Sequence, residues 1–339
     1  MRTLTRPELT AALAVRQGLA ERLRAAPAEA VRRLTPLQAQ HPPAPYLALA
    51  ARVEDFTREG LEAAITDGAV VKTTINRLTL HLAAAADYPA YAQLTRQARM
   101  RTWRKQFAHL DEEKVTAELR EWFREPRSNA DVRERVGAYE GVAAEPWAPV
   151  IFARTLLPLI QLPPAGHWDD SRRAPFVADP RPLPDPADAA TLVLECYLAA
   201  FGPASRRDAA AWAGVAQRDF AAAWERLETA EYGDGLRDLP GAPLPPADTP
   251  LPPRFLGHWD QALLAYADRE RIIPPELHPL AATVSGEPTF TVDGRVAGTW
   301  NVREGVLAVT PLVELSRAQL AAVKEEARRT ARFCGAKGP

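Results

Sequence analysis

Apolar positions recur along the chain with two different periods, which predicts a mixture of helices and strands. Helical spacing of apolar residues is found near residues 5–33, over 111–123 and from about 316 to 333. Runs rich in β-branched and aromatic residues occur at 70–82 and 288–312, the latter interrupted by turn dipeptides. The pattern therefore predicts an α+β fold in which helices and short strands alternate.

Four predicted helices begin with the same local signal, a hydroxyl residue followed three positions later by an acid or amide. This spacing lets each side chain satisfy the other residue's backbone N–H, as in a capping box. The pairs are Thr5 with Glu8, Ser128 with Asp131, Ser205 with Asp208, and Ser316 with Gln319. Gly335 is expected to end the last of these helices, because glycine adopts the left-handed conformation of a C-cap without steric cost.

The segment after Ser205 has the layout of a helix-turn-helix. Gly214 interrupts an apolar pattern of helical period, and helical spacing resumes after it. The dipeptide Asp234-Gly235 then predicts a hairpin turn. Two helices followed by a hairpin describe a winged helix, and the same order recurs elsewhere in the chain. We therefore expect three tandem winged-helix domains.

Two proline-rich stretches, 157–188 and 239–253, suggest where these domains meet. Proline interrupts both helices and sheet ladders, so each stretch is predicted to be an extended surface linker. The expected domains are residues 1–165, enlarged by insertions, 188–240, and 252–339.

Charge is distributed unevenly, although the net charge is only −1. Residues 1–110 contain 16 Lys/Arg and 9 Asp/Glu, a net of +7, and the remainder contains 26 and 34, a net of −8. A basic N-terminal part would attract a phosphate backbone.

Several classes of protein are disfavoured by what the sequence lacks. No apolar run has the length of a membrane span, and the N-terminus does not resemble a signal peptide, so a cytoplasmic protein is expected. The two cysteines do not suggest a disulfide framework, and the six histidines do not cluster at metal-ligand spacing. Neither a metal nor a cofactor is predicted.

The most distinctive local motif is Gln38-Ala39-Gln40, which precedes His41 and two prolines. Residues two apart project to the same side of an extended backbone, so Gln38 and Gln40 can direct two amides toward one site. Taken alone, two glutamines before a proline turn are more often an ordinary polar loop.

Two further groups of residues are candidates for contact with DNA. If 70–82 is a hairpin strand, strict alternation places Thr73, Ile75, Arg77, Thr79 and His81 on one face. That face could enter a groove of DNA. Alternatively, Thr79 and His81 could form hydrogen bonds only within the protein.

A basic cluster on a probable helix is the second group, and a solvated basic face is an equally good interpretation of it. Its members are Arg96, Arg99, Arg101, Arg104 and Lys105, interleaved with Trp103. The histidines at 109, 167, 258 and 278 have no convincing partners in the sequence and are interpreted as structural.

The segment LTPLQAQHPPAPYLALAARVEDF, which contains the Gln pair, resembles the AlkZ-like branch of a bacterial winged-helix family. Further landmarks are similar in order and spacing, at 76–82, 201–215, 252–273 and 290–300. One departure is Leu78, where a small residue often precedes the Thr of the family's Thr-x-His hairpin segment.

The resemblance implies a DNA glycosylase in which Gln38 and Gln40 form the catalytic motif. It implies duplex DNA bearing N7-alkylguanine as the substrate, bound on a concave face, and a role in repair or in self-resistance to a DNA-alkylating natural product, with unhooking of interstrand crosslinks as one form of it. Arg77, Thr79, His81, Arg101, Arg104 and Lys105 would contact the DNA. A monomer is expected, because no heptad-bearing dimerisation helix is evident. The alternative is a non-catalytic winged-helix DNA-binding protein, such as a transcription regulator.

Overall fold

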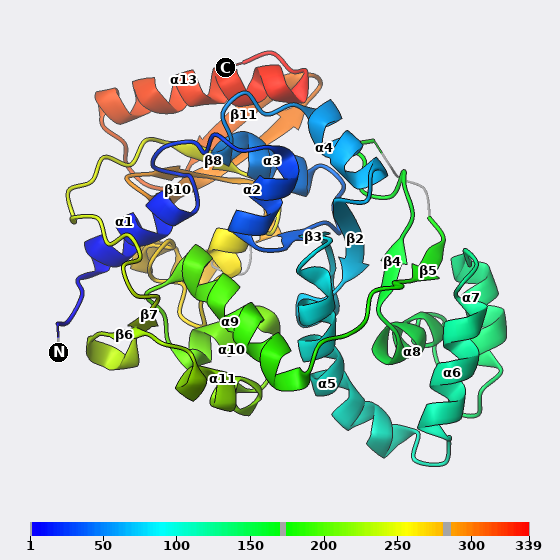
Figure 1. Cartoon of the computed structure of the whole chain (residues 1–339). Coiled ribbons are helices and arrows are strands. Elements are labelled where there is room, and N and C mark those ends of the chain that lie inside the picture. Colours follow the sequence, from blue (N-terminus) through cyan, green and yellow to red (C-terminus); the bar gives the residue numbers. More distant parts are fainter. Residues whose placement is uncertain (1, 170–173, 281–285, 339) are drawn as a thin grey trace.

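Two antiparallel sheets organise the molecule, and helices pack around both of them (Figure 1). The computed structural model describes residues 2–169, 174–280 and 286–338. The first sheet has the strand order β1-β3-β2-β4-β5. Its strands are β1 (Leu37–Gln38), β2 (Val70–Thr74), β3 (Leu80–Ala84), β4 (Leu159–Gln161) and β5 (Phe176–Ala178). The mixture of helices and sheets confirms the α+β class.

The second sheet is built from the C-terminal part, and helix α13 (Arg317–Cys334) covers it (Figure 1). Its strand order is β11-β10-β9-β8. The strands are β8 (Arg254–Leu256), β9 (Thr289–Val292), β10 (Arg295–Arg303) and β11 (Val306–Pro311). The predicted turns at 293–294 and 304–305 are confirmed, because all four residues have positive φ between consecutive strands. Gly335 ends α13 in the left-handed conformation, as predicted.

Four of the helices begin at the predicted capping signals. The four predicted capping boxes are present at the starts of α1, α7, α10 and α13. In the first half of the chain, the helices are α1 (Arg6–Arg16), α2 (Pro27–Leu34), α3 (Ala44–Arg52), α4 (Arg58–Thr66), α5 (Tyr88–Gln106), α6 (Glu112–Trp122), α7 (Asn129–Gly137) and α8 (Ala148–Leu156). The second halves of α5 and α8 enclose a separate core with α6 and α7.

The middle part has the predicted helix-turn-helix and hairpin. Its helices are α9 (Pro186–Phe201), α10 (Arg206–Ala213) and α11 (Ala221–Arg226), followed by the two-stranded ladder of β6 (Ala230–Glu231) and β7 (Arg237–Asp238). Gly214 ends α10 with φ of 72°, which explains why a glycine interrupts the helical pattern there.

The first proline-rich stretch is not only a linker, which corrects the prediction for 157–188. Strand β4 pairs with β2, and β5 pairs with β4, so this stretch completes the first sheet. The prolines flank these strands and leave two three-residue runs free to donate to the ladder. Residues 170–173 of the stretch lie outside the described residues. The second stretch, 239–253, contains neither helix nor strand, as predicted.

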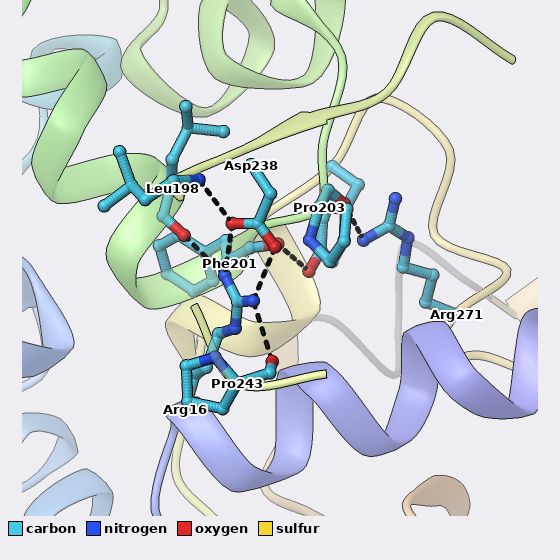
Figure 2. A network of polar contacts seen from close by, with 9 residues as sticks. Arg16, Leu198, Phe201, Pro203, Asp238, Pro243 and Arg271 are labelled. Atoms are coloured by element: carbon cyan, nitrogen blue, oxygen red, sulfur yellow. Dashed lines mark hydrogen bonds and ion pairs between the residues drawn. The ribbon is translucent and has the colours of Figure 1, made fainter. Parts of the chain in front are cut away.

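The three parts of the chain share their largest hydrophobic core. It contains Leu13 of α1, Tyr88 of α5, Trp212 of α10 and Leu263 of the C-terminal part. A buried polar network lies beside this core (Figure 2). In it, both terminal nitrogens of Arg16 donate to the carboxylate of Asp238, at 2.7 and 2.6 Å.

The Arg16–Asp238 pair is almost completely buried, with side-chain exposures of 2% and 1%. Arg16 also donates to the carbonyls of Leu198 and Pro243 (Figure 2), so its charge is well solvated by protein groups. Gly202 fits closely against the pair, because a Cβ there would lie 2.4 Å from an Asp238 oxygen. The pair therefore fixes α1 against the middle part of the chain.

Candidate active site

The Gln motif lies at an edge of the first sheet. Gln38 pairs with His81 in the ladder of β1 and β3, and the Ala39 N–H donates to Leu80 O at 2.7 Å. After Gln40 the ladder ends, because His41-Pro42-Pro43 turns the chain into α3. The sheet thus holds Gln38, which is 7% exposed, and delivers Gln40 to the surface.

The two amides contact each other directly. Gln38 Nε2 donates to Gln40 Oε1 at 2.8 Å, and Gln38 Oε1 accepts the backbone N–H of Gln40 at 3.1 Å. The buried amide therefore fixes the exposed one. The Gln40 oxygen retains a second lone pair for a further donor or for a positive charge. This geometry agrees with the expectation that both amides are directed toward one site.

His81 is a neutral side chain next to the motif. It is 2% exposed, and burial, helped by the nearby charge of Arg77, lowers the pKa of His81 to about 3. At neutral pH its Nδ1–H donates to Thr79 O at 3.0 Å. His81 therefore cannot act as a general acid near pH 7.

The predicted single face from Thr73 to His81 is wrong, because the chain reverses within it. Arg77 and Leu78 both have positive φ, 51° and 60°, and the tip closes with Thr79 N–H bonded to Asn76 O. Thr73 and His81 consequently become cross-strand partners. Alternation holds only along continuous extended backbone, and no Gly or Asn occupies the two positive-φ positions to signal this turn.

The hairpin tip contacts the middle part of the chain. The Arg77 guanidinium donates to Trp212 O, and burial lowers its pKa. A Cβ on Gly214 would lie 2.8 Å from the Arg77 backbone nitrogen. The Thr79 hydroxyl donates to Asn76 O at 3.0 Å. The side chains of Arg77 and Thr79 therefore make contacts within the protein, in addition to their predicted contact with DNA.

The basic cluster is confirmed to lie on a helix, α5, and much of its charge is paired. Arg101 makes two 2.7 Å bonds to Asp219, and Arg104 bonds Glu112 at 2.7 and 3.1 Å. Burial lowers the pKa of Arg99 to about 10. Lys105 is exposed near the end of the helix.

A residue interpreted from sequence as structural, His258, lies beside the motif. Its ring centroid is 4.4 Å from that of His41, the residue after Gln40. Next to it, Trp259 is 38% exposed and has φ of 48°. No sequence spacing could have joined residues so far apart, although both belong to segments that carry the family resemblance.

Possible metal ligands, and the lysine nearest to the Gln motif in the sheet, bear on the chemistry that the site could support. Across residues 2–169, 174–280 and 286–338, no group of three or more His, Cys, Asp or Glu is placed to hold a metal ion. Lys72 pairs with Leu82, one register position from Thr73 and His81, so it projects to the sheet face opposite Gln38. Within the same described ranges, no helix is long and apolar enough to cross a membrane.

The described residues thus combine an amide pair at a sheet edge with a hairpin whose tip packs against a helix-turn-helix. The DNA glycosylase AlkZ-like family model matches residues 31–333, and the chain belongs to this family. The matched segment includes the Gln motif, the hairpin and both later parts of the chain.

The chain is also similar to one curated protein and to one solved structure. It is 30% identical over 175 residues to an interstrand DNA cross-link repair glycosylase of Streptomyces sahachiroi, an alignment that covers 47% of each protein. The chain thus spans about half the length of that curated relative. Its fold is similar to the solved structure of Streptomyces sahachiroi DNA glycosylase AlkZ, with a TM-score of 0.82, 23% identity and 99% coverage of both chains.

Proposed function

We propose that this protein is a monofunctional DNA glycosylase that hydrolyses the N-glycosidic bond of N7-alkylated guanine in duplex DNA. The observation that carries the proposal is the exposed Gln40 amide held by the buried Gln38 amide. Family membership and the name of the curated relative support this class of reaction. By analogy with that relative, we include crosslinked adducts among the substrates and repair among the roles. We also propose that other bulky N7 adducts are substrates, and self-resistance to a genotoxic natural product is the alternative role.

The chemistry suits amides because alkylation at N7 makes the base a cation and a good leaving group. As the C1′–N9 bond breaks, its electron pair neutralises the purine, and positive charge develops on the sugar. Gln40 Oε1 would orient a water toward C1′ and stabilise that charge, while Gln38 positions the amide. Water oxygen bonds C1′, and the released proton goes to solvent.

We propose hydrolysis without lyase chemistry. A lyase needs an amine to form a Schiff base with the sugar, and Lys72 belongs to the opposite face of the sheet. We propose that the protein binds DNA as a monomer. Its three winged-helix modules would form a concave face, with Arg77, Thr79, Arg101, Arg104 and Lys105 toward the DNA. The sequence predicts that His81 joins them, but burial in the hairpin keeps its side chain from the surface.

The test is release of base from a duplex carrying one 7-methylguanine, followed by alkaline cleavage of the abasic site. We expect release from this duplex and none from a uracil duplex, because no acid is available to protonate a neutral base. Gln40→Ala should slow release by about 10- to 1000-fold, with DNA affinity unchanged.

Gln106→Ala, at the exposed last residue of α5, is the matched control and should retain wild-type turnover. Binding without release by the wild type would favour the alternative, a non-catalytic DNA-binding protein. Efficient removal of uracil would show that another group supplies acid catalysis.

A further inference from the structure

The loop that follows β8 is built against the helix that follows the Gln motif. A Cβ on Gly257 would lie only 3.0 Å from Leu47 Cβ and 3.3 Å from Ala44 O, so the loop backbone touches the start of α3. A side chain at this position would force Leu47 or the start of α3 to move by a few tenths of an ångström. The C-terminal part of the chain therefore packs against α3, the helix that follows the Gln motif.

A buried ion pair fixes this loop in place. Asp260 accepts two bonds from the Arg52 guanidinium, at 2.9 and 2.6 Å, and both side chains are 0% exposed. Asp260 also accepts the Ala262 N–H at 3.0 Å. An ion pair without access to water holds its geometry, because separating the partners would leave a buried charge. The residue before Asp260 is thus presented by a rigid backbone.

That residue is Trp259, and its conformation is unusual for an exposed tryptophan. A φ of 48° is the left-handed region, which costs a non-glycine residue about 1–2 kcal/mol. The indole is nonetheless 38% exposed, so its conformation is not explained by burial in a core. Strained backbone that presents a side chain to solvent is often found at ligand sites.

Two imidazoles connect this indole to the motif. The ring centroids of His258 and Trp259 are 5.7 Å apart, and those of His41 and His258 are 4.4 Å apart. His258 Nδ1 is bonded to Gly286 O at 2.9 Å, which fixes its ring. Burial, and the neighbouring His258, lower the pKa of His41, so its ring does not oppose a cationic ligand at neutral pH.

We propose that Trp259, supported by His258 and His41, contacts the positively charged alkylated purine and makes the site selective for it. This inference rests on the proposed function and names a specificity-determining residue for it. The face of an indole attracts a delocalised cation, and it also stacks on a purine. A neutral purine would gain only the stacking, so the aromatic surface favours the alkylated base.

The test compares Trp259→Ala, Trp259→Leu and Trp259→Phe under single-turnover conditions with a 7-methylguanine duplex. Alanine and leucine should slow release by about 5- to 30-fold, the order expected for loss of a cation–π contact. Phenylalanine should restore the rate to within about threefold, because it retains an aromatic face. Affinity for the matched undamaged duplex should not change in any variant.

Trp147→Ala is the matched control, since Trp147 is 61% exposed and lies at the start of α8, on another part of the surface. It should behave as wild type. Wild-type release by Trp259→Ala, or equal rates for leucine and phenylalanine, would overturn the inference.

A binding measurement separates this inference from the reaction itself. In a Gln40→Ala background, fluorescence anisotropy should show tighter binding of the 7-methylguanine duplex than of the undamaged one. Adding Trp259→Ala should remove this preference. If the wild type releases no base, the proposed function is wrong. If Gln40→Ala shows no preference for the lesion, or if adding Trp259→Ala leaves that preference unchanged, only the role of Trp259 is wrong.

Discussion

At the scale of single residues, the Gln motif and the neighbouring His81 are uncharged at neutral pH. Gln38 and Gln40 have no titratable proton, and His81 is held uncharged in the strand that pairs with Gln38. A cationic leaving group requires none of these groups to ionise. A neutral site also avoids electrostatic repulsion of the cationic lesion.

The burial of His81 has a measurable effect on stability. Its pKa is about 3 in the folded protein and near 6.5 when unfolded, so the unfolded chain binds the extra proton between these values. Stability is therefore full above about pH 6.5 and falls as the pH decreases, with a loss of about 2 kcal/mol between pH 7 and pH 5. Urea denaturation at the two pH values measures this loss.

His81→Asn is the matched variant, because its amide can still donate to the Thr79 carbonyl and does not titrate. All other ionisable groups are common to both proteins, so the difference between their pH dependences isolates His81. If both proteins show the same pH dependence of the unfolding free energy, His81 takes up its proton in the folded protein over the same pH range as in the unfolded chain.

At the scale of elements, the hairpin of β2 and β3 is held at its tip rather than projecting freely. Asn76, Arg77 and Leu78 form the turn, and the Arg77 backbone packs against Gly214 at the end of α10. The first sheet and the helix-turn-helix are thereby joined close to the Gln motif. Their relative position depends on the space that a glycine leaves.

Gly214→Ala tests this joint. The new Cβ would meet Arg77 backbone at 2.8 Å on a residue with φ of 72°, so both strain and a steric clash are expected. We expect the free energy of unfolding in urea to fall by about 2–4 kcal/mol. Gly235→Ala is the control, with φ of 69° and no atom within 4 Å of the Cβ.

The Gly235 variant should lose only the cost of positive φ, about 1 kcal/mol. Equal losses in the two variants would mean that the hairpin tip moves away from α10 freely, and that the joint is not a structural constraint.

At the scale of the whole molecule, two buried ion pairs connect the three parts of the chain. Arg16–Asp238 joins the first part to the middle, and Arg52–Asp260 joins the first part to the last. Both ion pairs are almost completely buried. Gln40 is exposed at the surface and is not enclosed in a core.

An exposed site predicts tolerance of large lesions. Many enzymes that act on bases rotate the nucleotide into a snug pocket, which a bulky or crosslinked adduct could not enter. At fixed DNA sequence, we expect the single-turnover rate to stay level or rise from 7-methylguanine to a large N7 adduct. A steep decrease with adduct size would indicate a closed pocket.

The sequence by itself determined the local structure and the candidate chemistry. Capping pairs, glycine C-caps and Asp-Gly turns act over a few residues, so helix ends and hairpins in the second half were predictable. Extended backbone allows residues two apart to share a side, which applies to Gln38 and Gln40. The family resemblance, and not this spacing, singled the pair out as the candidate catalytic motif. The charge pattern and the family resemblance supplied the expectation of DNA as a partner.

The tertiary structure decided what depends on contacts between distant segments. The prolines in 157–188 did not reveal that β4 and β5 complete the first sheet, because strand pairing is decided by partners elsewhere in the chain. Ion pairing of Arg101 and Arg104 depended on Asp219 and Glu112. The contact of His258 with His41, the residue after Gln40, joins segments far apart in the sequence. The buried Arg52–Asp260 pair does the same, since only folding brings charges 208 residues apart into contact.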